Sequence, residues 1–161
     1  MPGQTAYTVL PAVGLNGQIL DDGFNLITSY PASELISVGR LCEVVGGLLR
    51  MCQTAGANLG NVVGVSAYIG AREPGQFQIG DMVPVLRRGK IFAEWNGTTQ
   101  VEFATPNVNH SSTLAVSRGM FTDAVASAVA GSEISVAPTP GLIEVRPTGM
   151  ATTCLVELNL P

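Results

Sequence analysis

The sequence predicts a mainly β protein, a small β-barrel or β-sandwich with an extended N-terminal arm. Glycine and proline are frequent (19 Gly and 10 Pro in 161 residues) and are dispersed without a collagen-like period. Valine and threonine are common between these breaks, a composition typical of short strands joined by many turns. Charged residues make up only 12% and hydrophobic residues 46%, which excludes a highly charged disordered chain.

The length fits one domain with a long arm, and we expect the arm to be residues 1–34. Turn residues such as Asn16-Gly17 interrupt this stretch, and its apolar pieces, Tyr7 to Leu10 and Phe24 to Ile27, are too short for a core element. An arm that pairs or packs elsewhere fits this pattern, and an edge strand with loops is the alternative.

The β-rich domain is expected to comprise residues 35–161, and its first element is a hairpin over residues 36–53. Gly46-Gly47 supplies the positive φ angles of a tight two-residue turn. That turn places Glu43 opposite Arg50, an opposite-charge pair that supports the register. The same register puts Cys42 and Cys52 on opposite faces, so we expect no disulfide between them.

Residues 62–69 are predicted to form the next strand, followed by a second hairpin. In this hairpin, Met82 to Leu86 runs into a turn at Arg88-Gly89, and Lys90 to Trp95 returns. A turn at this position sets Leu86 opposite Ile91.

Trp95 ends the returning strand and shares a face with Ile91 and Ala93, so we expect it in the core. Asn96-Gly97 then turns the chain into a strand over 99–103. Together these segments predict a meander from residue 62 to residue 104.

The last third has weaker patterns, and residues 105–150 are expected to be an irregular insertion. Short apolar pieces between proline and glycine predict strands over 113–117, 134–137, 142–145 and 152–160, the last as a closing strand. Thr122 and Asp123 are able to cap a short helix over 124–130, although an ordered loop is equally compatible with these small residues.

The net charge of −4, with a single lysine, disfavours nucleic acid as a direct partner, because such partners select a basic surface. Sparse charge on an apolar chain has two interpretations. Either a partner covers much of the surface in an obligate assembly, or the chain is a monomer with a large core.

Membrane, secretion and metal signals are weak. Residues 51–71 lack charge but contain polar residues and four glycines, and residues 1–20 have no basic start, so we expect neither a membrane span nor a signal peptide. The three cysteines, at positions 42, 52 and 154, contain no CxxC pair, which predicts reduced structural thiols and no zinc.

No constellation of residues predicts catalysis or a cofactor. His110 is the single histidine and lies among Asn and Ser without a nucleophile-elbow motif, so a polar loop histidine is expected. Asp81 and Glu94 lie near each other in sequence but belong to expected strand ends, so they do not predict a carboxylate pair for acid–base catalysis. The glycines of 56–64 lack the Lys-Ser/Thr ending of a phosphate-binding loop.

One basic cluster stands out. Arg87, Arg88 and Lys90 are three of the eight basic residues and lie within four positions at the expected hairpin tip. Such a tip is able to dock an acidic protein surface or to contact phosphates, and a merely solvated turn is the simpler alternative.

Several motifs resemble the small capsid cement or decoration proteins of tailed bacteriophages. They are Val38-Gly39-Arg40-Leu41-Cys42-Glu43-Val44, Val62-Val63-Gly64-Val65-Ser66, Gly80-Asp81-Met82-Val83-Pro84-Val85, Gly89-Lys90-Ile91-Phe92-Ala93 and the closing Leu155-Val156-Glu157-Leu158. The resemblance covers roughly residues 36 to 104 and the tail.

The resemblance implies a structural, non-enzymatic virion protein on the outer capsid surface. It implies a homotrimer that ties neighbouring major capsid protein subunits together, with no cofactor, membrane or direct nucleic acid contact. Expected contact residues are Tyr7, Val9 and Leu10 in the arm, and Arg87, Arg88 and Lys90 at the tip. The alternatives are a carbohydrate-binding β-sandwich using Trp95, another virion part such as a tail or baseplate subunit, and a small hydrolase using His110.

Overall fold

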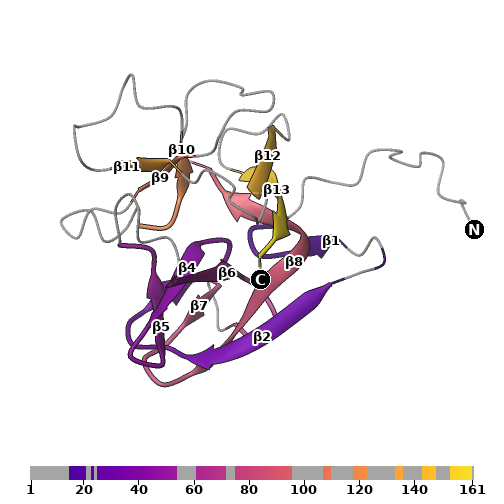
Figure 1. The fold of residues 1–161 in the computed structure, drawn as a ribbon. Coiled ribbons are helices and arrows are strands. Elements are labelled where there is room, and N and C mark those ends of the chain that lie inside the picture. Colours follow the sequence, from indigo (N-terminus) through magenta and orange to yellow (C-terminus); the bar gives the residue numbers. More distant parts are fainter. Residues whose placement is uncertain are drawn as a thin grey trace, which may run out of the picture.

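The computed structural model describes residues 15–20, 23, 25–53, 61–71, 75–95, 107–109, 118–122, 133–135, 143–147 and 153–160. These residues form antiparallel strands in three sheets, and none of them is in an α-helix. The prediction of a mainly β, sandwich-like fold is confirmed (Figure 1).

An eight-stranded sheet organises the molecule, with the strand order β12-β13-β8-β6-β4-β5 and with β1 and β2 also paired to β8. Its strands are β1 (Ile19–Leu20), β2 (Leu26–Pro31), β4 (Leu41–Val45), β5 (Leu48–Met51), β6 (Val62–Ser66), β8 (Met82–Glu94), β12 (Ile143–Pro147) and β13 (Thr153–Asn159). Two small sheets accompany it, one of β3 (Ile36–Ser37) with β7 (Gln76–Phe77), the other of β9 (Asn107–Asn109), β10 (Phe121–Thr122) and β11 (Glu133–Ser135).

Strand β8 is the central strand of the large sheet and pairs with β1, β2, β6 and β13 (Figure 1). Its first half pairs with β2 and β6, and its second half pairs with β1 and β13. At the far end of β2, Ala32 also bridges to Leu49 of β5, so the sheet curls towards its own edge.

A β-bulge divides the two halves of β8. Leu26 of β2 pairs with Arg88 and Ile27 pairs with Leu86, so Arg87 is skipped in this ladder. An extra residue of this kind shifts the alternation of side chains by one position. Leu86 and Ile91, five residues apart, therefore point into the same buried cluster, whereas a regular strand would place them on opposite faces.

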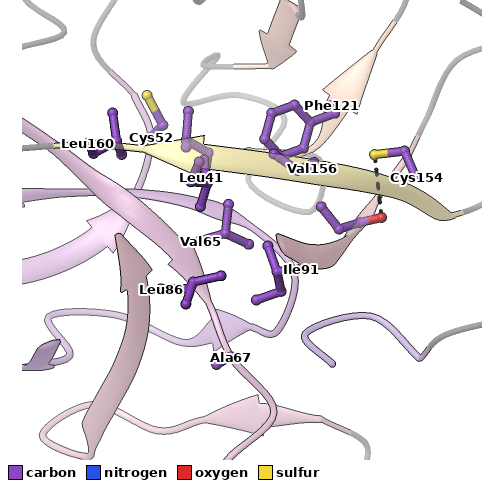
Figure 2. Close-up of a cluster of buried hydrophobic side chains, with 12 residues drawn as sticks. Leu41, Cys52, Val65, Ala67, Leu86, Ile91, Phe121, Cys154, Val156 and Leu160 are labelled. Carbon is purple, nitrogen blue, oxygen red and sulfur yellow. Dashed lines mark hydrogen bonds between the residues drawn. The ribbon is translucent and has the colours of Figure 1, made fainter. Parts of the chain in front are cut away.

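Two hydrophobic clusters lie on the two faces of this curled sheet. One contains Leu86, Ile91, Phe121, Cys154 and Val156 among others, from segments far apart in the sequence (Figure 2). The other cluster is formed around the first half of β8 and the small sheet of β3 and β7. Its buried members are Ala32, Ile36, Val38, Cys42, Leu49, Met51, Phe77, Val83 and Val85.

The predicted first hairpin is confirmed in its register. β4 and β5 pair with Glu43 opposite Arg50, and these side chains form an ion pair at 2.9 Å. Gly46 and Gly47 have φ angles of 61° and 82°, as a tight primed turn requires. Cys42 and Cys52 form no disulfide and lie in different clusters, as expected.

The predicted second hairpin is wrong, because β8 continues through Arg88-Gly89 as one strand of 13 residues. A hairpin turn and a bulge have the same effect on side-chain parity. Either one places Leu86 and Ile91 on one face, and the sequence pattern does not distinguish them. The backbone bonds of β13 and β1 to Lys90 and Ile91 hold the second half in line with the first.

Other predicted elements have mixed outcomes. β6 and β13 lie within the strands expected at residues 62–69 and 152–160, and β11 and β12 overlap those expected at 134–137 and 142–145. Trp95 packs against the first cluster, as predicted. The helix or loop at 124–130 and the strands at 99–103 and 113–117 lie outside the described residues.

Within the expected arm, residues 19–20 and 26–31 are strands paired with β8. None of the six residues of β2 is buried, three being exposed and three half-buried. The boundary at residue 34 and the insertion at 105–150 stay predictions.

Candidate interaction surfaces

The expected basic contact residues do not lie at a hairpin tip. Arg87, Arg88 and Lys90 lie mid-way along β8 and are half-buried. Arg88 Nε donates to the carbonyl oxygen of Leu160 at 3.1 Å, whereas Arg87 Nε is buried without a hydrogen-bond partner among the described residues. Because both sides of the strand are occupied, only the side-chain ends of this cluster are available to a partner.

The other expected contact residues are those of the N-terminal arm. Tyr7, Val9 and Leu10 lie outside the described residues. Their role in binding stays a prediction.

Exposed hydrophobic residues lie on three segments that backbone hydrogen bonds join at residues 32–33, and we call this set the apolar end. Ile79 is 73% exposed and Met82 is 59% exposed, unusually high values for such side chains. The apolar end consists of Leu35, Val45, Leu48, Ile79 and Met82. Clustered apolar exposure of this kind typically marks an interaction surface.

Residues 31–35 hold the apolar end together. Ala32 N donates to Asp81 O and Gly80 N donates to Ala32 O, both at 2.9 Å, which fixes the turn that carries Ile79. On the other side, Ser33 N donates to Leu49 O at 2.8 Å, which fixes the β4–β5 hairpin. The surface is therefore built on backbone that is already hydrogen-bonded.

A chain of partly buried ionic contacts connects Arg40, Glu94, Arg118 and Glu34. Arg40, only 5% exposed, donates from Nε to Glu94 Oε2 at 2.6 Å and from Nη1 to the carbonyl oxygen of Arg118 at 2.8 Å. Arg118 in turn pairs with Glu34. These contacts join β8, the segment before β4 and the segment at residues 118–119, so the network locks distant parts of the chain together.

A pocket of about 540 Å³ opens beside this network. It is lined by Leu15, Asn16, Ser37, Val38, Arg40, Tyr68, Gly75, Gln76 and Glu94. Its volume is in the range of small-molecule sites, and its lining combines one aromatic ring with several polar side chains.

The three cysteines are structural. Burial raises the pKa of the Cys154 thiol to about 12, and its Sγ donates to Ala93 O at 3.6 Å (Figure 2). Burial also raises the pKa of Cys42, with a further contribution from neighbouring Cys52. Thiols held in the protonated form are poor nucleophiles and poor metal ligands.

The remaining candidates for chemistry have structural surroundings. Glu94 is paired with Arg40, and Asp81 accepts a hydrogen bond from the backbone of Gln78. His110 lies outside the described residues. Across the part of the chain that the structure describes, no three His, Cys, Asp or Glu side chains gather as a metal site would need, and no helix is long and apolar enough to cross a membrane.

Comparison with known proteins decides the family. The sequence profile described as structural cement protein (E217 gp24/Pam3 gp6) matches residues 3–158. The chain belongs to this family of phage cement proteins. Among curated proteins, no sequence matches.

A solved structure agrees with the family on the fold. A chain of "The capsid of Myoviridae Phage XM1" superposes with a TM-score of 0.69 at 13% identity, over 98% of this chain and 97% of that one. A cement protein is a structural component of the virion capsid.

The apolar end was not predicted from the sequence. The apolar end draws residues from three segments that meet only through long-range backbone bonds. The exposed isoleucine next to Gly80 in a turn was the one local signal for it.

Proposed function

We propose that this cement protein binds the outer surface of an icosahedral phage shell as a homotrimer and clamps neighbouring major capsid subunits. The match to the cement family over residues 3–158 is the observation that carries this proposal. The sparse charge of the chain and the exposed hydrophobic side chains at the apolar end also favour it.

The clamp stabilises the shell by binding the assembled state better than free subunits. Such differential binding shifts the assembly equilibrium by mass action. In a trimer, the second and third contacts are intramolecular, so modest contacts add up to tight overall binding.

The apolar end is the first contact surface of this clamp, and the arm residues Tyr7, Val9 and Leu10 are the second. An extended arm is able to add a strand to a neighbouring sheet edge through backbone hydrogen bonds alone. Arg87, Arg88 and Lys90 contribute through their side-chain ends, where a capsid carboxylate is able to pair with them.

Co-sedimentation with purified expanded and unexpanded shells tests the proposal. We expect the chain to pellet with expanded shells, to raise their melting temperature, and to have three times the chain mass in light scattering. A monomer that ignores every shell would overturn it.

Variants separate the two contact surfaces. The double change Ile79→Ser and Met82→Ser is expected to weaken shell binding at least tenfold, with Leu26→Ser and Ile27→Ser, exposed on β2, as the matched control. For the arm, the cut belongs before residue 15, because Gly17 and Gln18 are hydrogen-bonded to Phe92. Removal of residues 1–14 is expected to preserve folding and to lower shell occupancy, and unchanged occupancy would exclude the arm from the contact.

A further inference from the structure

The pocket beside the Arg40–Glu94 pair shares no lining residue with the apolar end, and backbone hydrogen bonds fix its walls. Gly17 N donates to Phe92 O and Tyr68 N donates to Gly17 O, both at 2.7 Å. Val38 N, also in the lining, donates to Gly75 O at 3.1 Å. A cavity whose walls are fixed in this way is pre-formed, and binding there costs little ordering of the protein.

The polar lining combines donors with acceptors and is close to neutral overall. Arg40 contributes a guanidinium group and Glu94 a carboxylate, and their charges cancel in the ion pair. Asn16 and Gln76 add amide groups, and Asn16 Oδ1 already accepts from Thr153 Oγ1 at 3.0 Å, which leaves its NH₂ as a donor. A charged ligand gains little in such a site, whereas a neutral ligand that both donates and accepts fits it well.

Hydroxyl groups are the neutral groups that donate and accept at one atom. Two adjacent hydroxyls of a sugar are able to accept from the guanidinium and donate to the carboxylate of one ion pair. Tyr68, 36% exposed at the pocket wall, supplies a ring against which the C–H face of a sugar packs. Leu15, 68% exposed, adds apolar surface to the pocket lining.

We propose that this pocket is a binding site for one neutral hexose or N-acetylhexosamine residue of a glycan. This role is separate from the clamp, because the apolar end draws none of its residues from the pocket lining. Tyr68 provides the stacking surface, and Arg40, Glu94, Asn16 and Gln76 provide hydrogen bonds to the hydroxyls. The site differs from the carbohydrate surface expected around Trp95, which packs against the core instead.

Saturation-transfer NMR of the full chain with glucose, galactose, mannose and N-acetylglucosamine tests the proposal. We expect transfer to at least one of these sugars, with a dissociation constant in the millimolar range. Gln76→Ala is expected to weaken that binding about tenfold, and Tyr68→Ala to abolish it, whereas Tyr68→Phe preserves the ring and the signal.

Gln78→Ala is the matched control, because Gln78 is an exposed glutamine two positions away that does not line the pocket. It should bind the sugar as the parent chain does. No transfer from any of the four sugars at 20 mM, or equal binding by Gln76→Ala and the parent chain, would overturn the proposal. Shell co-sedimentation of Gln76→Ala is expected to match the parent chain, so failure here leaves the clamp untouched.

Discussion

The two halves of β8 belong to one strand, but their odd-numbered side chains point into two different cores. Val83 and Val85, before the bulge at Arg87, point into the cluster around Phe77, whereas Ile91 and Ala93, after it, point into the cluster around Phe121. Neighbouring strands also change at this point, from β2 and β6 to β1 and β13. The extra residue therefore reverses which positions of β8 face each core, and Leu86 before the bulge shares a core with Ile91 after it.

The comparison also shows where the fold is least tolerant. In the first half, β6 crosses so close to β8 that Gly64, at a φ of 146°, has no room for a side chain: a β carbon there would lie 2.0 Å from the backbone oxygen of Leu86. At the junction, a β carbon on Gly89 would meet the side chain of Asn25 instead. The backbone of Leu86 is held by the hydrogen bonds of the sheet, whereas the side chain of Asn25 is able to rotate. A side chain at position 89 is therefore better tolerated than one at position 64.

The largest effect is expected for Gly64→Ala. The clash with Leu86 O requires β6 and β8 to separate, and we expect a loss of at least about 3 kcal/mol in the free energy of unfolding. Urea denaturation followed by circular dichroism measures this loss. Gly46→Ala, in a turn with nothing within 4 Å, is the control and is expected to cost about 1 kcal/mol. Equal costs for the two variants would mean that the crossing is not as close as described.

A smaller effect is expected at the junction. Gly89 has a φ of 123°, and Gly89→Ala is expected to cost about 2 kcal/mol, partly from this backbone conformation and partly from crowding against Asn25 Oδ1 at 2.2 Å from the new β carbon. Combining it with Asn25→Ala removes the crowding. The double variant should therefore be more stable than the sum of the two single effects predicts, by about 1 kcal/mol. Strict additivity would contradict the contact.

Several features of the large sheet could be predicted from the sequence. The Gly46-Gly47 turn, its register and the closing strand follow from local rules, because a two-residue turn fixes which residues face each other. The parity of Leu86 and Ile91 was also correct. The direction of the chain after Arg88 was predicted wrongly. It depends on pairing with β1 and β13, which come from opposite ends of the sequence.

The interaction surfaces were harder to predict for the same reason. Ile79 and Leu48 are 31 positions apart, and only their shared neighbours at Ala32 and Ser33 bring them to one end of the sheet. Likewise, the sequence around Arg40 does not indicate that its side chain binds Glu94 and the carbonyl oxygen of Arg118. Local periodicity carries no information on such contacts, whereas family resemblance did indicate the role.

The smallest effect concerns the thiols that lie in the two cores. Burial raises the pKa of Cys154 from 9.0 to about 12, so above pH 9 the unfolded chain releases this proton while the folded chain keeps it. The free energy of unfolding should then fall with rising pH, by up to about 1.4 kcal/mol per pH unit for this thiol. Cys154→Ala should show a shallower fall than the parent chain between pH 9 and 10.5, measured by urea denaturation. Cys42→Ala, in the other core, should lose a similar share, because burial raises that pKa too. Slopes identical to the parent chain in both variants would mean that water reaches the thiols in the folded state, and that neither core is as closed as the packing on the two sides of β8 indicates.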